Sequence, residues 1–437
     1  MIKKFLSYTM PSATGMFVVG IYIIVSGIFI GRGIGSSGLA AITVVLPFTM
    51  IINSLSSIFS IGASNTIGYY LGKNNIQKAT GIFRLVSYSS IFVSILFQVI
   101  GFLFLKNILN GLTSSPTLLN ESRGYLFWYL VFTLPIVLQS IFNLFLKNDG
   151  KQRKAMLILI TSTLITLFLE YIFIFKLHLG LESVAISLGI GQSIAVIYEV
   201  IYFLKFSTYL TFGKCKFVWR DLRKVIKIGL PTFFITVSFS LIILFTNSFL
   251  LKAYGEIGIA AFGIANYLTG LNYYVSLGVS DGISPLLSYY IGKDSLSKAK
   301  KIYNYATIMN FAIGATLTLL FVIFGKDLIS LYTSSKELMN LSYIALIITS
   351  IGYTGFSINL IDTTVYQSLH KTPISYLLSF MRGIVFILIG LYTLPLIFGN
   401  IGIWYAFVFS EFISFIIMTI IFRIIKKSFT FHKIKYS

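Results

Sequence analysis

Charged side chains are scarce in this 437-residue chain, and acidic ones are scarcer still. Only 11% of the residues are charged, 13 of them Asp or Glu, whereas a soluble globular domain carries about 25%. The single cysteine, Cys215, excludes an intramolecular disulfide. No glycine-rich phosphate loop occurs, which argues against ATP-driven chemistry. The three histidines lie outside the apolar runs without metal-ligand spacing, which argues against a resident metal, a cofactor and an intramembrane enzyme.

Long apolar runs are abundant instead, and 56% of the chain is hydrophobic. Runs of roughly 20 residues cross a bilayer as helices, whereas barrel strands are about half as long. The sequence therefore predicts an all-α integral membrane protein with twelve transmembrane helices. The predicted spans are 12–31, 42–70, 85–105, 121–146, 155–177, 184–204, 228–250, 259–290, 305–325, 338–369, 374–397 and 401–422.

The net charge of +21 follows the predicted topology and does not indicate a nucleic-acid partner. With the N-terminus inside, 26 of the 34 lysines and arginines fall in cytoplasmic segments and seven fall outside. Arg382 alone lies in the middle of a predicted span, since Arg123 and Lys176 lie at the ends of theirs. Basic residues on the inner side orient helices during insertion. We therefore expect a multi-pass protein of the bacterial cytoplasmic membrane, with both termini in the cytoplasm.

An internal repeat divides the chain into two halves. Residues 11–79 align without a gap to 231–299, with 18 identities in 69 positions. Six spans per half make both repeats enter the membrane from the same side, as in transporters built from parallel repeats. We predict two pseudo-symmetric six-helix lobes, 1–204 and 228–437, joined by a cytoplasmic linker at 205–227. The second lobe would end in a short basic cytoplasmic tail.

Several motifs occur in a specific order along the chain. The first half contains "FIGRGIGSSGLAAITVVLPF", "GASNTIGYYLGKNNIQKA", "NLFLKNDG" and "TLFLEYIFIF", and the second contains "IGIAAFGIANYL", "GVSDGISPLLSYYIGKDS" and "VYQSLHKTP". In this order the sequence resembles the multidrug and toxic compound extrusion (MATE) transporters, in their bacterial drug-exporter branch. The resemblance covers essentially the whole chain.

The resemblance implies a secondary antiporter that acts by rocking its two lobes. It would export bulky amphiphilic or cationic organic compounds in exchange for H⁺ or Na⁺, as a monomer in the lipid bilayer without ATP. An alternative within the same superfamily is a flippase for lipid-linked oligosaccharides. Such a flippase needs cationic residues along its cleft to bind pyrophosphate, and Arg382 is the one cation in the middle of a predicted span.

Four acids lie at predicted membrane depth, where lipid exposure is costly and a functional role is the default hypothesis. These cation-coupling candidates are Glu170, Asp281, Asp362 and Glu411. The alternative is a buried pair that only fixes packing. Glu199 lies near the cytoplasmic Lys205, where snorkelling is cheap. The remaining acids are expected to be ordinary solvated charges.

The resemblance points first to Glu170. Many members carry an Asp at this fifth-helix position, facing an Asp on the first helix, where this chain has Ser26. Glu170 would bind the incoming H⁺ or, transiently, Na⁺. The resemblance also implies an acid on the tenth helix, to which Asp362 would correspond. The supporting polar candidates are Ser26, Thr166 and Asn143 in the first lobe, and Asn247 and Arg382 in the second.

Aromatic residues are candidates for the substrate cleft, because a ring face attracts an organic cation by ~0.5–2 kcal/mol. The alternative for each is helix packing or an interfacial aromatic belt. The residues on helices predicted to face the cleft are Tyr22, Tyr273, Tyr274, Tyr353 and Phe356.

Overall fold

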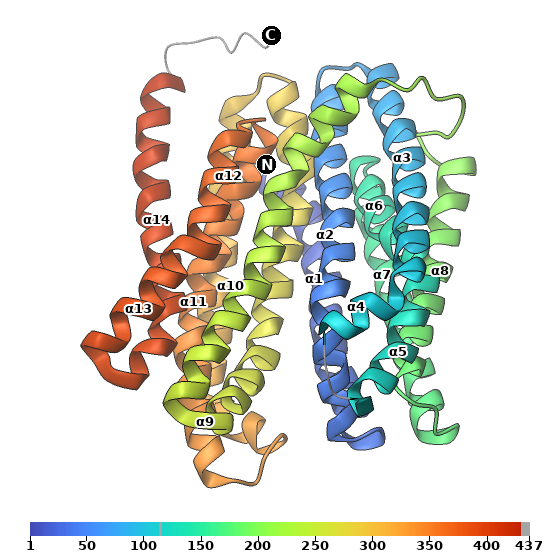
Figure 1. Ribbon diagram of the computed structural model, residues 1–437. Helices are drawn as coiled ribbons and strands as arrows, with labels where there is room; N and C mark the ends of the chain where they lie inside the picture. The colour runs from blue at the N-terminus through green and yellow to red at the C-terminus, as the bar shows by residue number, and fades with distance from the viewer. Residues whose placement is uncertain (113–115, 430–437) are drawn as a thin grey trace.

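Two bundles of helices stand side by side in the computed structural model, which describes residues 1–112 and 116–429 (Figure 1). No β-strand occurs within these ranges. The last eight residues of the predicted basic tail, 430–437, lie outside the described residues.

The first bundle holds the first half of the chain. Its helices are α1 (Ile2–Gly33), α2 (Ser36–Gly72), α3 (Ile76–Leu103), α4 (Leu105–Leu112), α5 (Pro116–Val131), α6 (Thr133–Asn148), α7 (Gln152–Tyr171), the π-helical turn η1 (Ile172–Lys176) and α8 (Glu182–Lys205).

The second bundle holds the second half. Its helices are α9 (Trp219–Gly292), α10 (Leu296–Ser330), α11 (Lys336–Ser368), α12 (Thr372–Phe380), the π-helical turn η2 (Met381–Val385), α13 (Phe386–Phe398), the short 3₁₀ turn η3 (Gly399–Ile401) and α14 (Gly402–Phe429).

Nine helical stretches of the described chain are long and apolar enough to cross a membrane, and the bent pair α5–α6 adds a tenth. Two of the nine each contain two spans. The first is α9, which reverses at Gly255, where φ is 66° and only glycine fits without strain. The second is Pro373–Ile420, which breaks at Gly399, where φ is 64°. The twelve predicted spans are thereby accounted for.

The predicted span 121–146 is not straight, because the chain bends by 53° between α5 and α6. Pro135 lacks the N–H that would bond to the carbonyl of Val131, and its ring crowds that carbonyl. The Gln98 side chain of α3 donates a hydrogen bond to the same carbonyl at 2.8 Å. The bend therefore leaves no unpaired backbone oxygen at Val131.

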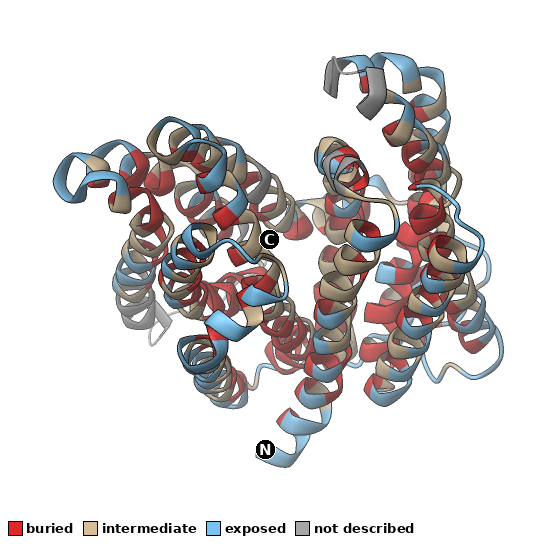
Figure 2. Cartoon of the chain, turned by 90° about the horizontal axis from the view of Figure 1, so that it is seen from below, coloured by how far each residue is buried: buried red, intermediate tan, exposed pale blue. Residues whose placement is uncertain are grey.

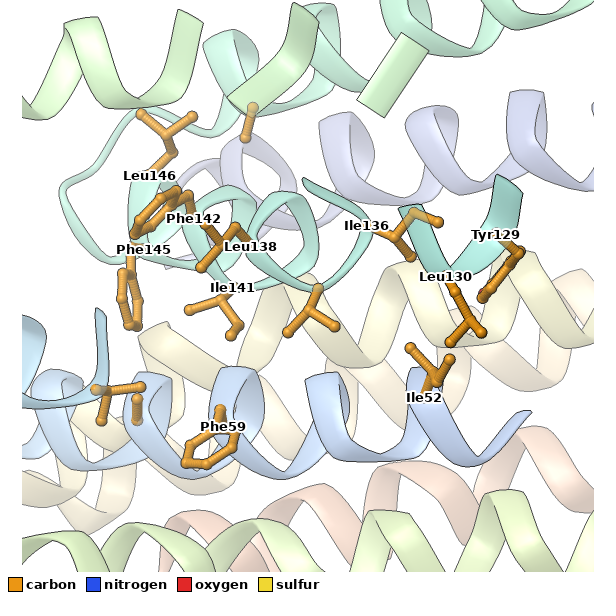
Figure 3. Packing of buried hydrophobic residues seen from close by; sticks show 14 of the residues in the cluster. Ile52, Phe59, Tyr129, Leu130, Ile136, Leu138, Ile141, Phe142, Phe145 and Leu146 are labelled. Atoms are coloured by element: carbon orange, nitrogen blue, oxygen red, sulfur yellow. The ribbon is translucent and has the colours of Figure 1, made fainter. Parts of the chain in front are cut away.

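Buried residues face the inside of each bundle and exposed residues the outside (Figure 2). Many of the exposed residues have large apolar side chains. In the first bundle, Ile52 and Phe59 of α2 pack with Leu130 of α5 and Ile141 of α6 (Figure 3). On the outside, Leu396 is 86% exposed. Apolar surface of this extent suits a lipid environment and would be a liability in water.

The connection between the bundles is shorter than the predicted linker 205–227, because α9 already begins at Trp219. Leu222 and Val225 are buried, so this first turn of α9 packs into the protein. The connection is fastened to the first bundle. Asp149 accepts hydrogen bonds from the hydroxyl groups of Tyr202 and Ser207 and from the backbone N–H groups of Thr208 and Tyr209, and Arg84 donates to the carbonyls of Thr211, Phe212 and Lys214. The expectation that Asp149 is an ordinary solvated charge is wrong.

The two bundles touch backbone to backbone at one end of the molecule. We call this the basic end, and it is formed by the connections 73–75, 149–151, 206–218, 293–295 and 369–371 (Figure 1). A Cβ on Gly62 of α2 would collide with the carbonyl oxygen of Val225, and one on Gly229 of α9 with the carbonyl oxygen of Ile58. Small residues permit such close approach between membrane helices. The structure is therefore closed at the basic end.

Gly62→Leu is expected to separate the bundles at the basic end and to abolish transport, since backbone in both helices blocks the new side chain. Pulsed electron–electron double resonance between spin labels on the two bundles measures the separation. Gly81→Leu is the matched control, because a Cβ there meets nothing within 4 Å. An unchanged distance distribution in Gly62→Leu would contradict the role assigned to this contact.

Candidate functional site

Glu170 lies at the junction of three helices inside the first bundle. It is fully buried in the last turn of α7, and the Tyr22 hydroxyl of α1 donates a hydrogen bond to its Oε1 at 2.9 Å. Ser26, one turn further along α1, lies within interaction range of both side chains, and Tyr125 of α5 is close to Glu170. Oε2 accepts no hydrogen bond of ordinary geometry from the described residues. The site therefore offers a buried carboxylate oxygen to a proton or a small cation.

Local structure places Glu170 next to an irregular turn. The π-helical turn η1 follows directly at Ile172, and such wide turns occur often at functional sites. Thr166, one turn before Glu170, donates its hydroxyl to the Ser162 carbonyl at 3.0 Å and packs against Gly191 of α8. Thr166 thus joins α7 to α8 through a satisfied hydroxyl.

The structure does not bring Asn143 to Glu170. The Asn143 amide donates to the Ala155 carbonyl at 3.0 Å and to Glu199 Oε1 at 3.4 Å. Ala155 and Glu170 are fifteen positions apart on α7, which is roughly 22 Å along a helix. Asn143 therefore belongs to a separate polar group near the basic end.

Glu199 is part of that group and is completely buried, so the expectation that it snorkels to the surface is wrong. Its Oε2 has no hydrogen-bond partner within the described ranges. Nearby, Lys147 of α6 is also buried, and its Nζ lies 3.9 Å from Oδ2 of Asp281 on α9. This ion pair links the two bundles. Sequence reasoning missed Lys147, because the apolar run ends one residue before it.

A second acidic cluster occupies the other bundle. Arg382, in the π-helical turn η2, lies with its Nε 3.6 Å from Oε1 of Glu411, and its guanidinium stacks 5.0 Å from the ring centre of Phe356. Asn359 donates to Oε2 of Glu411 at 2.7 Å and to its backbone carbonyl at 2.9 Å. Arg382 and Glu411 are both buried, so each charge depends on the other.

Asp362 lies on α11, one turn from Asn359, and is also buried. Its carboxylate interacts with the hydroxyl of Tyr303 on α10 and, through space, with Arg382. Three of the four predicted acids therefore lie in or next to the second bundle. Asn247 of α9 is half-buried, and its side-chain oxygen has no hydrogen-bond partner among the residues that the structure describes.

The aromatic candidates fall into two places. Tyr22 contacts Glu170, as described. Tyr273 and Tyr353 pack on Phe356 within the second bundle, with ring centres 5.4 Å and 5.9 Å away. Tyr274 packs edge-on against Tyr273 and lies near Gly20 of α1, where the bundles meet. In this closed state, Tyr273, Tyr353 and Phe356 pack on one another inside the second bundle.

A small cavity opens inside the second bundle beside Tyr353. Among its lining residues are Thr246, Asn266, Thr349 and Trp404, and it has about 20 Å³ of room for the centres of water molecules. That holds one or two waters. Drug-sized ligands fill pockets of about 300–1,000 Å³, so this cavity does not accommodate one in the closed state.

Comparison with known proteins identifies the architecture. The sequence matches the MatE family twice, over residues 11–172 and 231–393. The chain belongs to the MatE family. The two MatE matches begin 220 positions apart, which equals the spacing of the internal repeat. MatE proteins are transporters and not enzymes, so the chain is a multi-pass membrane transporter.

Curated relatives span nearly the whole chain. It is similar to the multidrug export protein MepA of Staphylococcus haemolyticus strain JCSC1435, with 25% identity over 427 residues, or 97% of this chain and 93% of the relative. It is also 22% identical over 433 residues to the MepA of Staphylococcus saprophyticus, covering 99% of this chain and 95% of that protein. The predicted family resemblance is confirmed.

Solved MATE structures have the same fold. A MATE protein in complex with MaL6 superposes with a TM-score of 0.91 at 20% identity, over 98% of this chain and 96% of that one. An outward-facing multidrug resistance MATE family transporter gives 0.91 at 21% identity, over the same shares. The predicted fold class, twelve transmembrane helices in two lobes, is confirmed.

Proposed function

We propose that the chain exports bulky amphiphilic or cationic organic compounds, including drugs, in exchange for H⁺ or Na⁺. Membership of the MatE family and the multidrug export named for the MepA relatives support the substrate class. The observation that carries the coupling is the buried Glu170. The Tyr22 hydroxyl donates to one of its oxygens, and the other accepts no hydrogen bond of ordinary geometry from the described residues. Only an ion that binds the two transport states unequally can drive a change between them.

The surroundings of Glu170 suit a single bound cation. The carboxylate oxygen and the nearby hydroxyl groups of Tyr22 and Ser26 are the oxygen ligands that hard cations prefer. A proton on the carboxylate would serve the same purpose, because either ion neutralises the buried charge of Glu170. Neutralisation would allow the lobe to close around Glu170 without a buried charge.

We also propose that the basic end faces the cytoplasm of a bacterial cell, with both chain termini on that side, and that the protein acts as a monomer. The support is the excess of lysine and arginine in the connections of that end. The substrate would then enter when the basic end opens and leave after it closes.

The flippase alternative gains no support from the buried cations. A pyrophosphate-linked lipid needs cationic side chains that are free to bind it. Among the described residues, Lys147 and Arg382 are the buried cations, and each is paired with a carboxylate, Asp281 and Glu411 respectively.

Efflux from proteoliposomes tests the proposed function. A panel of fluorescent organic cations is loaded, and a pH gradient and a Na⁺ gradient are imposed in separate experiments. We expect export of several chemically unrelated cations under one of the two gradients and little export under the other. Absence of export under both gradients would overturn the proposal, provided that the circular dichroism spectrum of the reconstituted protein shows the expected helical content.

A further inference from the structure

A buried lysine and an aspartate form an ion pair between the bundles near the basic end, and the two partners differ in exposure. Lys147 lies in the last turn of α6 with 4% of its side chain exposed, whereas Asp281 of α9 retains 18%. The separation of 3.9 Å between Nζ and Oδ2 is at the long limit for a contact pair. The carboxylate is therefore the accessible partner, and the ammonium is the buried one.

Lys147 has a second carboxylate within its own bundle. Glu199 of α8 interacts with Lys147 electrostatically without forming a contact ion pair, and its Oε1 is held by the Asn143 amide. Its Oε2 is buried, and no described residue bonds to it. Lys147, Asn143 and Glu199 move as one unit when the bundles separate, whereas Asp281 moves with the other bundle.

From this arrangement we infer that Asp281 is a binding site for monovalent organic cations when the basic end is open, and that Lys147 is the internal cation that displaces them on closure. The inference rests on the proposed function. At this step of the transport cycle, the Lys147 side chain replaces the bound organic cation as the counter-ion of Asp281.

Each partner of the ion pair has a replacement counter-ion in the open state. When the bundles part, Lys147 turns to the unpartnered oxygen of Glu199, so that no buried ammonium is left alone, which would cost several kcal/mol. Asp281 then becomes an unpaired anion on the wall of the opening. An organic cation can take the place of the ammonium there, and Tyr273, two turns away on α9 and within electrostatic range of Asp281, supplies an aromatic face.

Closure reverses the exchange. The backbone contacts at Gly62 and Gly229 bring α9 back against the first bundle, and Lys147 returns to within reach of Asp281. The Lys147 ammonium and the bound cation repel each other when both are close to the Asp281 carboxylate, so the cation is held less tightly as the basic end shuts. Its affinity then falls on the side where it must be released.

Two variants that break the same ion pair separate this role from simple packing. Lys147→Gln removes the competing cation and leaves Asp281 free, so we expect it to bind tetraphenylphosphonium about tenfold more tightly than the wild type. Asp281→Asn removes the binding carboxylate, so we expect binding at least about tenfold weaker. Equilibrium binding is measured on full-length protein in lipid nanodiscs.

A distance measurement accompanies the binding. Spin labels at Gln77 and Ser297, exposed and repeat-related positions on opposite bundles, report opening of the basic end. Both variants should lengthen this distance, because both remove the bridge. Lys78→Gln is the matched control. It breaks a different ion pair, to Asp221 at the same end, and should leave the affinity for tetraphenylphosphonium unchanged.

The outcomes are separable. Changes of affinity in the same direction in the two variants, or no change in either, would overturn the exchange while leaving the proposed function in place. A wild-type protein that binds no tetraphenylphosphonium would count against the proposed function and against the exchange together. Lys147→Arg keeps a cation and should restore wild-type affinity. Tight binding by Lys147→Arg like that of Lys147→Gln would also contradict the inference.

Discussion

Glu170→Gln is expected to lower ion-driven export by about 100-fold or more. The amide keeps the size of the side chain and its contact with Tyr22, but it neither gains nor loses a proton at neutral pH and carries no charge for Na⁺. An ion gradient then has no group through which to bias the two states. The measurement is export of a fluorescent organic cation from proteoliposomes under the gradient that drives the wild type.

Two further variants make this result specific to the carboxylate. Glu337→Gln changes an exposed acid in the first turn of α11 and should transport normally. Tyr22→Phe removes one hydrogen bond to a charged group, worth about 1.5–3 kcal/mol, and should fall between the two. Export by Glu170→Gln at the wild-type rate, with the same dependence on the gradient, would rule out Glu170 as the coupling residue.

Arg382→Met is expected to destabilise the protein by about 3–5 kcal/mol, because it leaves the buried carboxylate of Glu411 without its cation. The double variant with Glu411→Gln removes both charges and should recover most of the loss. The measurement is the thermal unfolding midpoint of the purified protein in detergent.

The control for this comparison is Lys336→Met, at an exposed cation at the start of α11, which should unfold as the wild type does. A double variant no more stable than Arg382→Met alone would show that Arg382 acts through packing on Phe356 and not through its charge.

Hydropathy and the positions of charged, glycine and proline residues were sufficient to predict the spans, and alignment of the two halves was sufficient to predict the repeat. Each apolar run has the length of a membrane-spanning helix, which is one of the few structures that satisfy the backbone in lipid. The repeat spacing of 220 residues can be found without knowledge of how the helices pack. The bend between α5 and α6 was within reach as well, since Pro135 removes the hydrogen bond that a straight helix would need at Val131.

Side-chain partnerships were harder to predict, because they depend on which helices become neighbours. Lys147 follows an apolar run and looks like a surface lysine until α9 is placed against it. Glu199 likewise lies near basic residues in the sequence, yet neighbouring helices bury it completely. The separation of Asn143 from Glu170 was predictable in principle. Asn143 lies near the end of its predicted span, beside the loop that leads to the next one, whereas Glu170 lies near the far end of that next span.

Because residues 206–218 are hydrogen-bonded to the first bundle, the connection limits how far the two bundles can separate. Asp149 and Arg84 hold the connection almost to the start of α9, and Lys78 forms an ion pair with Asp221 in the first turn of α9. The second bundle then cannot drift away from its partner on this side. The second bundle can therefore rotate only about the start of α9. The opening for a solute at the basic end is then widest on the side farthest from that hinge.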